Sequence, residues 1–343
     1  MRVLLFSFLI LNFSFVCAAE PQSYALVVAG DGTEANFTEN YKDWAVRSHK
    51  VLTADCGIPA ANVHVLIEKK ELAPQVASAV STKENVLKEF ADLAAKVKSG
   101  DQVVVIYIGH GTQQNNIGKL CIPGPDISSD ETGELLNKLP TTEVIFINSA
   151  TCSDAFLEKC SKPGRVVITA TNSNAEGNET YFMEFFLRAY EDRDKAKTPT
   201  LSILDAFNLA ATNCPKWYLR QYWVDADHAW RTEGKRSREL WQKFYGKVAD
   251  KKEAPPENAD AEDADPQLGE WGPQWEGRRM PTEHAQIDDN GDHQGTAVFN
   301  NSEFSPVTGS EEGADGWYAR KIVVGKPGGA KDLKIVEPKK QDK

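Results

Sequence analysis

The fold is decided by residues Val103–Gly111, which read VVVIYIGHG, and by residues Val144–Cys152, which read VIFINSATC. Each stretch opens with an apolar run that does not alternate with polar residues, which is typical of strands in a sheet covered on both faces. His110 follows the first run and Cys152 follows the second. Because the carboxyl ends of parallel strands meet at one edge of a sheet, we expect these two side chains to lie at the same edge.

Apolar runs and segments of helical spacing alternate on both sides of this pair. Strands are predicted at Tyr24–Ala29, Val63–Ile67, Val103–Ile108, Val144–Ile147 and Arg165–Thr171. Helices are predicted at Asn40–Ala54, Thr132–Leu139, Glu179–Tyr190 and Leu201–Tyr222. A further helix is predicted to begin at a capping box of Ser81 and Glu84 and to end at Gly100. This alternation predicts an α/β domain with a doubly wound, mostly parallel central sheet.

Composition divides the chain into five segments. Residues 1–19 combine Arg2, an apolar run and the small residues Cys17-Ala18-Ala19, which is the pattern of a cleaved signal peptide. We expect the α/β domain at 20–247, followed by a flexible acidic and proline-rich insertion at 248–280. A segment at 281–325 completes the domain, with a last strand predicted at Gly316–Val324, and a charged tail follows at 326–343. The signal peptide predicts a secreted or periplasmic protein.

Length and charge exclude some classes of partner. A chain of 343 residues, 41% of them hydrophobic, can bury a sizeable core in one large or two small domains. The net charge of -11 argues against nucleic acid as a main partner. No segment after residue 19 is apolar enough to span a membrane, so we expect no membrane span in the mature chain. The oligomeric state is not specified.

Five cysteines follow the predicted signal peptide: Cys56, Cys121, Cys152, Cys160 and Cys214. An odd number in an oxidising compartment leaves at least one thiol without an intramolecular partner. One free reactive thiol with up to two disulfides fits this count. Several buried, inert cysteines fit it as well.

His110 and Cys152 have the surroundings that thiol chemistry needs. Cys152 precedes a predicted helix start, and a helix N-terminus favours the thiolate. His110 is a candidate base because its pKa lies near neutrality. Gly111 has no side chain, so its N–H and that of Cys152 can approach a substrate oxyanion. The alternative is a small buried cysteine at a strand–helix turn and a structural histidine.

The other histidines are weaker candidates. We interpret His49 and His64 as structural and place His228 in a polar loop. His284 and His293 flank the acidic run Asp288–Asp292, which suggests calcium but lacks the glycine and closing glutamate of the helix-loop-helix calcium pattern. We interpret this run as a polar turn, and we expect neither a metal nor a cofactor.

The chain resembles the legumain-like cysteine peptidases of the caspase–gingipain–separase fold. The resemblance covers about residues 23–220 and rests on YALVVAG, VVVIYIGHG, VIFINSATC and RVVITAT, in that order. Glu283–Asp292 and Gly316–Val324 look like the closing part of secreted bacterial members. The resemblance implies a caspase-like three-layer sandwich.

The resemblance also implies a cysteine endopeptidase that acts on peptides or proteins. His110 would be the base, Cys152 the nucleophile, and the amides of Gly111 and Cys152 the oxyanion hole. Legumains carry an acidic residue where this chain has Ala150, and an Arg-His pair where it has Lys42-Asp43, so cleavage after asparagine does not follow. A non-catalytic binding module of the same fold and a transpeptidase are the alternatives.

Overall fold

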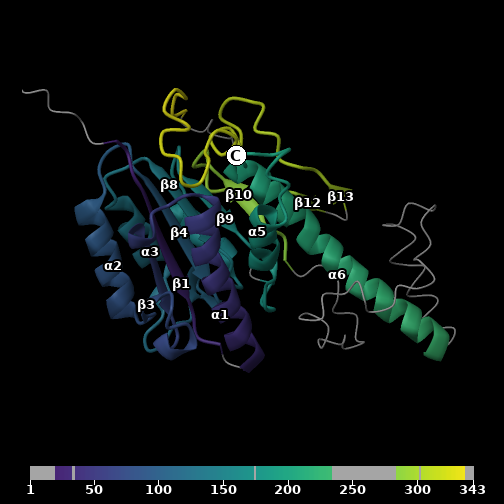
Figure 1. Cartoon of the computed structure of the whole chain (residues 1–343). Helices are drawn as coiled ribbons and strands as arrows, with labels where there is room; N and C mark the ends of the chain where they lie inside the picture. The colour runs from purple at the N-terminus through teal and green to yellow at the C-terminus, as the bar shows by residue number, and fades with distance from the viewer. Residues whose placement is uncertain (1–19, 33–34, 174, 234–282, 301–302, 337–343) are drawn as a thin grey trace, which may run out of the picture.

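The computed structural model of the protein describes residues 20–32, 35–173, 175–233, 283–300 and 303–336 (Figure 1). The predicted signal peptide at 1–19, the insertion at 248–280 and the end of the charged tail lie outside these ranges. Within them, no helix is both long and apolar enough to cross a membrane.

An eight-stranded sheet in the order β11-β10-β9-β8-β4-β1-β2-β3 forms the centre of the fold. Its strands are β1 (Ser23–Ala29), β2 (Val63–Ile67), β3 (Ala77–Val80), β4 (Gln102–Ile108), β8 (Glu143–Asn148), β9 (Val166–Thr169), β10 (Gln286–Asp288) and β11 (Thr296–Ala297). All neighbours pair in parallel except β10, which is antiparallel to β9 and β11. This confirms the predicted α/β class with a mostly parallel central sheet.

Helices cover both faces of this sheet. One face carries α1 (Ala35–Lys50) with its π-helical continuation η1 (Val51–Asp55), α5 (Phe182–Glu191) and α6 (Ile203–Glu233). The other carries α2 (Lys83–Lys96), α3 (Ser129–Asn137) and α4 (Leu157–Cys160). Val104 and Ile106 of β4 pack into the first layer, and Val103 and Val105 pack into the second. The result is the predicted three-layer sandwich.

Shorter elements complete the fold. They are the 3-10 turns η2 (Ala60–Asn62), η3 (Lys70–Leu72) and η4 (Ser153–Phe156), the small sheet β5 (Gly111–Gln114), β6 (Ile117–Leu120) and β7 (Ile127–Ser128), and the pair β12 (Phe299–Asn300) and β13 (Glu303–Phe304). The expected strand at Gly316–Val324 is wrong, because this segment forms turns. The expected loop around His228 is also wrong, since α6 continues through it.

Two helix starts differ from the sequence prediction. At α2 the cap is Thr82, whose hydroxyl accepts from the amide of Asn85, and not Ser81, which is buried. At α3 a capping box that the sequence analysis missed joins Ser128 and Glu131, so the helix begins earlier than predicted. Ser128-x-x-Glu131 has the same spacing as the pair chosen at α2, so spacing alone did not separate the true capping box from the false one.

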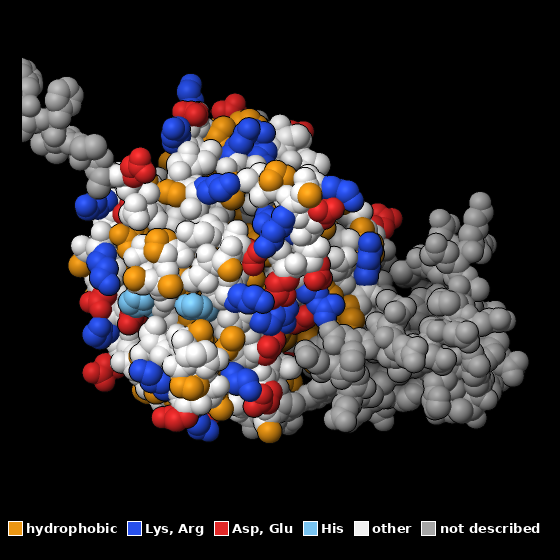
Figure 2. Space-filling model, in the orientation of Figure 1, with side chains coloured by type: hydrophobic (Ala, Val, Ile, Leu, Met, Phe, Trp, Pro, Cys, Tyr) orange, Lys and Arg blue, Asp and Glu red, His pale blue; other side chains and the backbone are white. Residues whose placement is uncertain are grey.

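Arg47 ties α1 to α5. Its guanidinium lies 2.5 Å from Glu184 Oε2 and 2.6 Å from Glu191 Oε2. The indole of Trp44 donates to the same Glu184 oxygen at 2.9 Å. Acidic and basic side chains intermingle on the surface that carries these helices (Figure 2). The network joins α1, which carries Tyr41 of the site described below, to α5, which follows the loop that carries Glu179.

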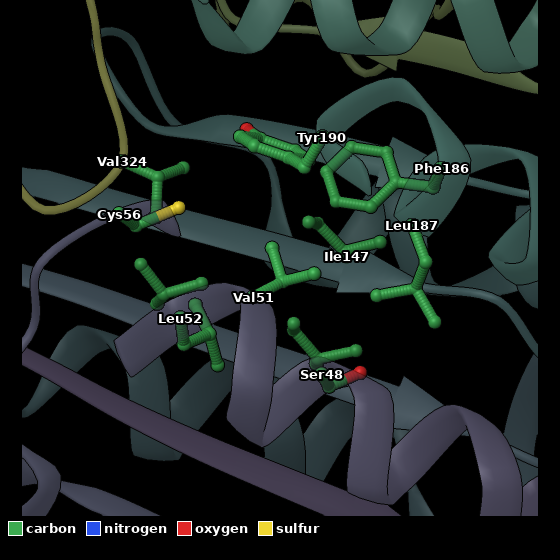
Figure 3. Close-up of a pocket in the computed structure, with 11 residues that line it drawn as sticks. Ser48, Val51, Leu52, Cys56, Ile147, Phe186, Leu187, Tyr190 and Val324 are labelled. Atoms are coloured by element: carbon green, nitrogen blue, oxygen red, sulfur yellow. The ribbon is translucent and has the colours of Figure 1, made fainter. Parts of the chain in front are cut away.

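A small apolar cavity lies between this helical layer and the sheet (Figure 3). Its lining includes Val51, Leu52, Ile147, Phe186 and Val324. These side chains belong to the hydrophobic core or pack against it, and neither His110 nor Cys152 lines the cavity. The cavity is therefore a packing feature of the core and not the candidate site.

The C-terminal turns lie at the amino ends of the strands. Gln102 and Glu143, the first residues of β4 and β8, accept hydrogen bonds from Gly325 N at 2.7 Å and Gly328 N at 2.8 Å. Gln102 Nε2 also donates to Glu143 at 2.6 Å. The end of the described chain therefore packs against the edge of the sheet opposite to the one that His110 and Cys152 follow (Figure 1).

The acidic run after β10 forms a turn that holds this C-terminal segment. Asp288 accepts from Gly291 N at 2.8 Å, and Asp289 Oδ2 accepts from Tyr318 N at 2.9 Å. Asp315 accepts from Thr296 Oγ1 at 2.6 Å. All three carboxyl groups belong to buried residues. Burial, together with the charges of Asp288 and Asp289, raises the pKa of Asp315 to about 8.

Asp315 should therefore make the free energy of unfolding depend on pH. An unfolded aspartate has a pKa of about 3.9. Between that value and about 8, the folded chain holds a proton that the unfolded chain lacks, so stability falls as pH rises through this window. We expect Asp315→Asn to match the wild type near pH 4 and to exceed its stability by about 1–3 kcal/mol near pH 9.

Urea unfolding at both pH values measures this difference. Asp288 and Asp289, whose pKa values are also raised, keep part of the pH dependence in the variant. An equal difference between variant and wild type at the two pH values would contradict the prediction.

Candidate active site

The two sequence-predicted side chains follow neighbouring strands. β4 and β8 pair in parallel up to Tyr107 and Asn148. Ser149 continues this pairing by donating from its N–H and its hydroxyl to the carbonyl of Tyr107, each at 2.8 Å. His110 and Cys152 follow within four residues of this pair. The sheet therefore brings their backbones to the same edge, as the sequence analysis expected.

Thr151 joins the two strand ends. Its hydroxyl donates to the carbonyl of Gly111 at 2.8 Å and accepts from the amide of Gly111 at 2.7 Å. The same oxygen lies 3.3 Å from His110 Nδ1. A Cβ on Gly111 would lie 2.1 Å from the carbonyl oxygen of Thr151, so only glycine fits there. The sequence analysis missed Thr151, although it directly precedes Cys152.

Cys152 begins the 3-10 turn η4 in a left-handed conformation. Its φ is +51°, and its amide donates to the carbonyl of Glu176 at 3.4 Å. The residue is 8% exposed. Among the described residues, the ring of His110 is hydrogen-bonded to Glu179 and Thr151 and not to the Cys152 thiol.

The surroundings of Cys152 favour the protonated form of its thiol. Burial raises its pKa, and the carboxylates of Asp154 and Glu176 raise it further. This shift is opposite in direction to the one expected from a helix start. Burial is the larger cause of this shift and the charges of Asp154 and Glu176 are the smaller ones, while η4 spans only four residues and has a short helix dipole.

The described cysteines are all free thiols. Cys160 and Cys214 are fully buried, and burial raises the pKa of the Cys160 thiol to about 12. These two fit the interpretation of buried, inert cysteines. Cys152 is not bonded to Cys160 and is a free thiol.

His110 has a carboxylate partner that the sequence analysis did not find. Its Nδ1 lies 2.9 Å from Glu179 Oε1, and the hydrogen bond to this carboxylate raises the pKa of the imidazole against the opposing effect of burial. The other oxygen of Glu179 accepts from the hydroxyl of Tyr41. No catalytic motif in the sequence includes Glu179. It reaches His110 only because the loop between β9 and α5 passes the strand ends.

The same loop makes a second carboxylate–imidazole pair. Glu176 contacts His284 Nδ1 and accepts from Asn172 N at 2.9 Å. The His284 ring stacks on Phe299 with ring centres 5.5 Å apart. Since the carbonyl of Glu176 also accepts from the Cys152 amide, this pair lies on the Cys152 side of the loop. His284, which precedes the acidic run in the sequence, therefore lies near the candidate site.

The remaining sequence candidates lie elsewhere. His64 pairs with Glu89 of α2 at 2.5 Å, His49 lies on α1, and His293 occupies a left-handed turn position. Among the residues that the structure describes, no group of histidine, cysteine and acidic side chains has the arrangement of a metal site.

A family model described as "Metacaspase, peptidase C14 domain" matches residues 40–139. The match includes His110 and Gly111 and ends before Cys152. A search of curated proteins gave no match. Among solved structures, the crystal structure of a Geobacter sulfurreducens protein is similar at 15% identity and a TM-score of 0.38, covering 57% of this chain and 90% of that one.

The family match supports the superfamily of caspase-fold cysteine peptidases, in agreement with the observed α/β sandwich. It also supports cysteine protease activity in general. The details specific to legumain-like and secreted bacterial members stay predictions.

Proposed function

We propose that the protein is a secreted or periplasmic cysteine endopeptidase with Cys152 as nucleophile and His110 as base. One observation carries the proposal: β4 and β8 end side by side. The hydroxyl of Thr151, which precedes Cys152, is hydrogen-bonded to the backbone of Gly111, which follows His110. The metacaspase match supports the peptidase class. Export rests on the predicted signal peptide, which lies outside the described residues.

The raised pKa of Cys152 determines how the reaction would begin. Because the raised pKa favours the protonated thiol, His110 accepts its proton as the sulfur attacks the substrate carbonyl carbon. The imidazolium then gives this proton to the amine that leaves when the peptide C–N bond breaks. Water, deprotonated by His110, attacks the resulting thioester and releases the carboxylic acid and the free thiol.

The amides proposed for the oxyanion hole have internal partners in the unliganded chain. Gly111 N donates to Thr151 Oγ1, and Cys152 N makes a longer bond of 3.4 Å to Glu176 O. A substrate oxyanion would replace both acceptors. An ionised acceptor makes stronger hydrogen bonds than a hydroxyl or a carbonyl, so this exchange favours the tetrahedral intermediate over the resting state.

A non-catalytic peptide-binding module is the second candidate. The buried, protonated thiol and the two occupied amides are the observations that favour it. A transpeptidase would form the same thioester but transfer the acyl group to an amine, and added amine acceptors separate it from a hydrolase.

A library of peptide acyloxymethyl ketones tests the catalytic proposal. We expect at least part of the library to label the wild-type protein at Cys152, because the probe alkylates a thiol that a base can activate. Cys152→Ala and His110→Ala should lose this labelling, with rates of peptide cleavage reduced by about 100-fold or more. Mass spectrometry locates the modified cysteine.

Cys160→Ala is the matched control, because it removes a buried thiol away from the strand ends. Circular dichroism confirms that each variant is folded. A folded wild type that shows no labelling at Cys152 across the library, but binds peptides, would favour the binding module.

The pH dependence of thiol alkylation tests the protonation state of Cys152. We expect iodoacetamide to modify Cys152 more slowly at pH 7 than it modifies a free thiol, with a midpoint above the free-cysteine value of about 8.5. Asp154→Asn should move this midpoint down, because it removes one of the negative charges that raise the pKa. A midpoint below the free-cysteine value would show a preformed thiolate and contradict the proposed first step.

A further inference from the structure

We propose that Glu179 is a positioning residue for His110 and that Tyr41 holds Glu179 in place. The inference rests on the proposed function, because it gives His110 the role of base. It adds Glu179 and Tyr41 to a site for which the sequence predicts the side chains of His110 and Cys152.

The contacts of Nδ1 determine the tautomer of His110. Nδ1 lies 2.9 Å from Glu179 Oε1 and 3.3 Å from Thr151 Oγ1. A carboxylate only accepts, and the single hydroxyl proton of Thr151 is used in the 2.8 Å bond to the carbonyl of Gly111. Nδ1 must therefore carry the proton. Nε2 is left as the basic nitrogen, which is the form that accepts a proton from a thiol.

The charge of Glu179 stabilises the product of proton transfer. When His110 accepts the thiol proton, the new imidazolium lies next to a carboxylate whose side chain is 14% exposed. Such a partly buried pair is screened less by water than a surface pair. The raised pKa of His110 agrees in sign with this stabilisation. It also compensates for the raised pKa of Cys152, which by itself disfavours the transfer.

Tyr41 makes Glu179 rigid. The Tyr41 hydroxyl donates to the oxygen of Glu179 that does not contact His110, and Tyr41 is 3% exposed. Its ring packs against Trp44 of α1 with centres 6.1 Å apart, and Trp44 is hydrogen-bonded to Glu184. Both carboxylate oxygens of Glu179 are thus used, and its orientation depends on the α1–α5 contact.

Glu179→Gln tests this inference because it keeps the size of the side chain and removes its charge. We expect kcat/KM to fall about 100-fold, mostly in kcat, because substrate contacts are unchanged while the base is misoriented and its cation is less stable. Glu179→Asp should recover part of the activity. Tyr41→Phe should cause a smaller loss of the same kind.

The matched control is Glu89→Gln. Glu89 also pairs with a histidine, His64, but this pair lies on β2 and α2, away from the strand ends. Glu89→Gln should leave kcat/KM within about twofold of the wild type, because it changes no group at the site. A loss equal to that of Glu179→Gln would show that the effect is one of general stability, and would overturn the inference.

A readout without catalysis separates this inference from the proposed function. Nitrogen NMR of the six histidines reports the tautomer and pKa of each ring, and His110→Gln assigns the signal of His110. We expect the wild type to show His110 protonated at Nδ1 with a raised pKa, and Glu179→Gln to lower this pKa. An unchanged pKa and tautomer in Glu179→Gln would overturn the inference, whether or not the protein cleaves peptides. Absence of Cys152 labelling, with the expected NMR result, would overturn the proposed function alone.

Discussion

The parallel pairing of β4 with β8 is the constraint on which the rest of the site depends. Six residue pairs, from Gln102↔Glu143 to Tyr107↔Asn148, fix the register of the two strands. Because side chains alternate between faces, a shift by one residue would exchange the two core layers, which pack against different helices. The same register places Thr151 against Gly111. Burial of both faces of the sheet therefore fixes the strand register, and the register fixes the positions of the site residues.

Three acidic side chains lie close to His110 and Cys152 and affect their pKa values. The loop between β9 and α5 supplies Glu176 and Glu179, and η4 supplies Asp154. Burial, together with the charges of Asp154 and Glu176, raises the pKa of the Cys152 thiol, whereas the hydrogen bond to Glu179 raises the pKa of His110. The proposed reaction therefore moves the thiol proton to His110, where the carboxylate of Glu179 can stabilise it.

The sequence predicted the strands and helices that depend on a local residue pattern. It did not predict contacts between residues that are far apart in the chain. The five apolar runs were found because strands buried on both faces leave a continuous signal, as Val103–Ile108 does. Strand β3 and the short strands β5–β7 carry mixed residues and were missed. Glu179 could not be found, since its partner His110 is 69 residues away and no spacing rule joins them. The acidic effect on Cys152 was missed because helix-start reasoning considers the dipole and not the neighbouring carboxylates.

The central claim is that the two strand ends build one site in which Cys152 attacks a carbonyl group assisted by His110. A crystal structure of the protein bound covalently to a peptide acyloxymethyl ketone tests it most directly. The account predicts a bond from Cys152 Sγ to the probe, with the probe oxygen at the amide of Gly111, the Thr151 hydroxyl displaced from that amide, and His110 still paired with Glu179. A probe bonded to another cysteine, or a His110 ring turned away from the Cys152 adduct, would contradict the account.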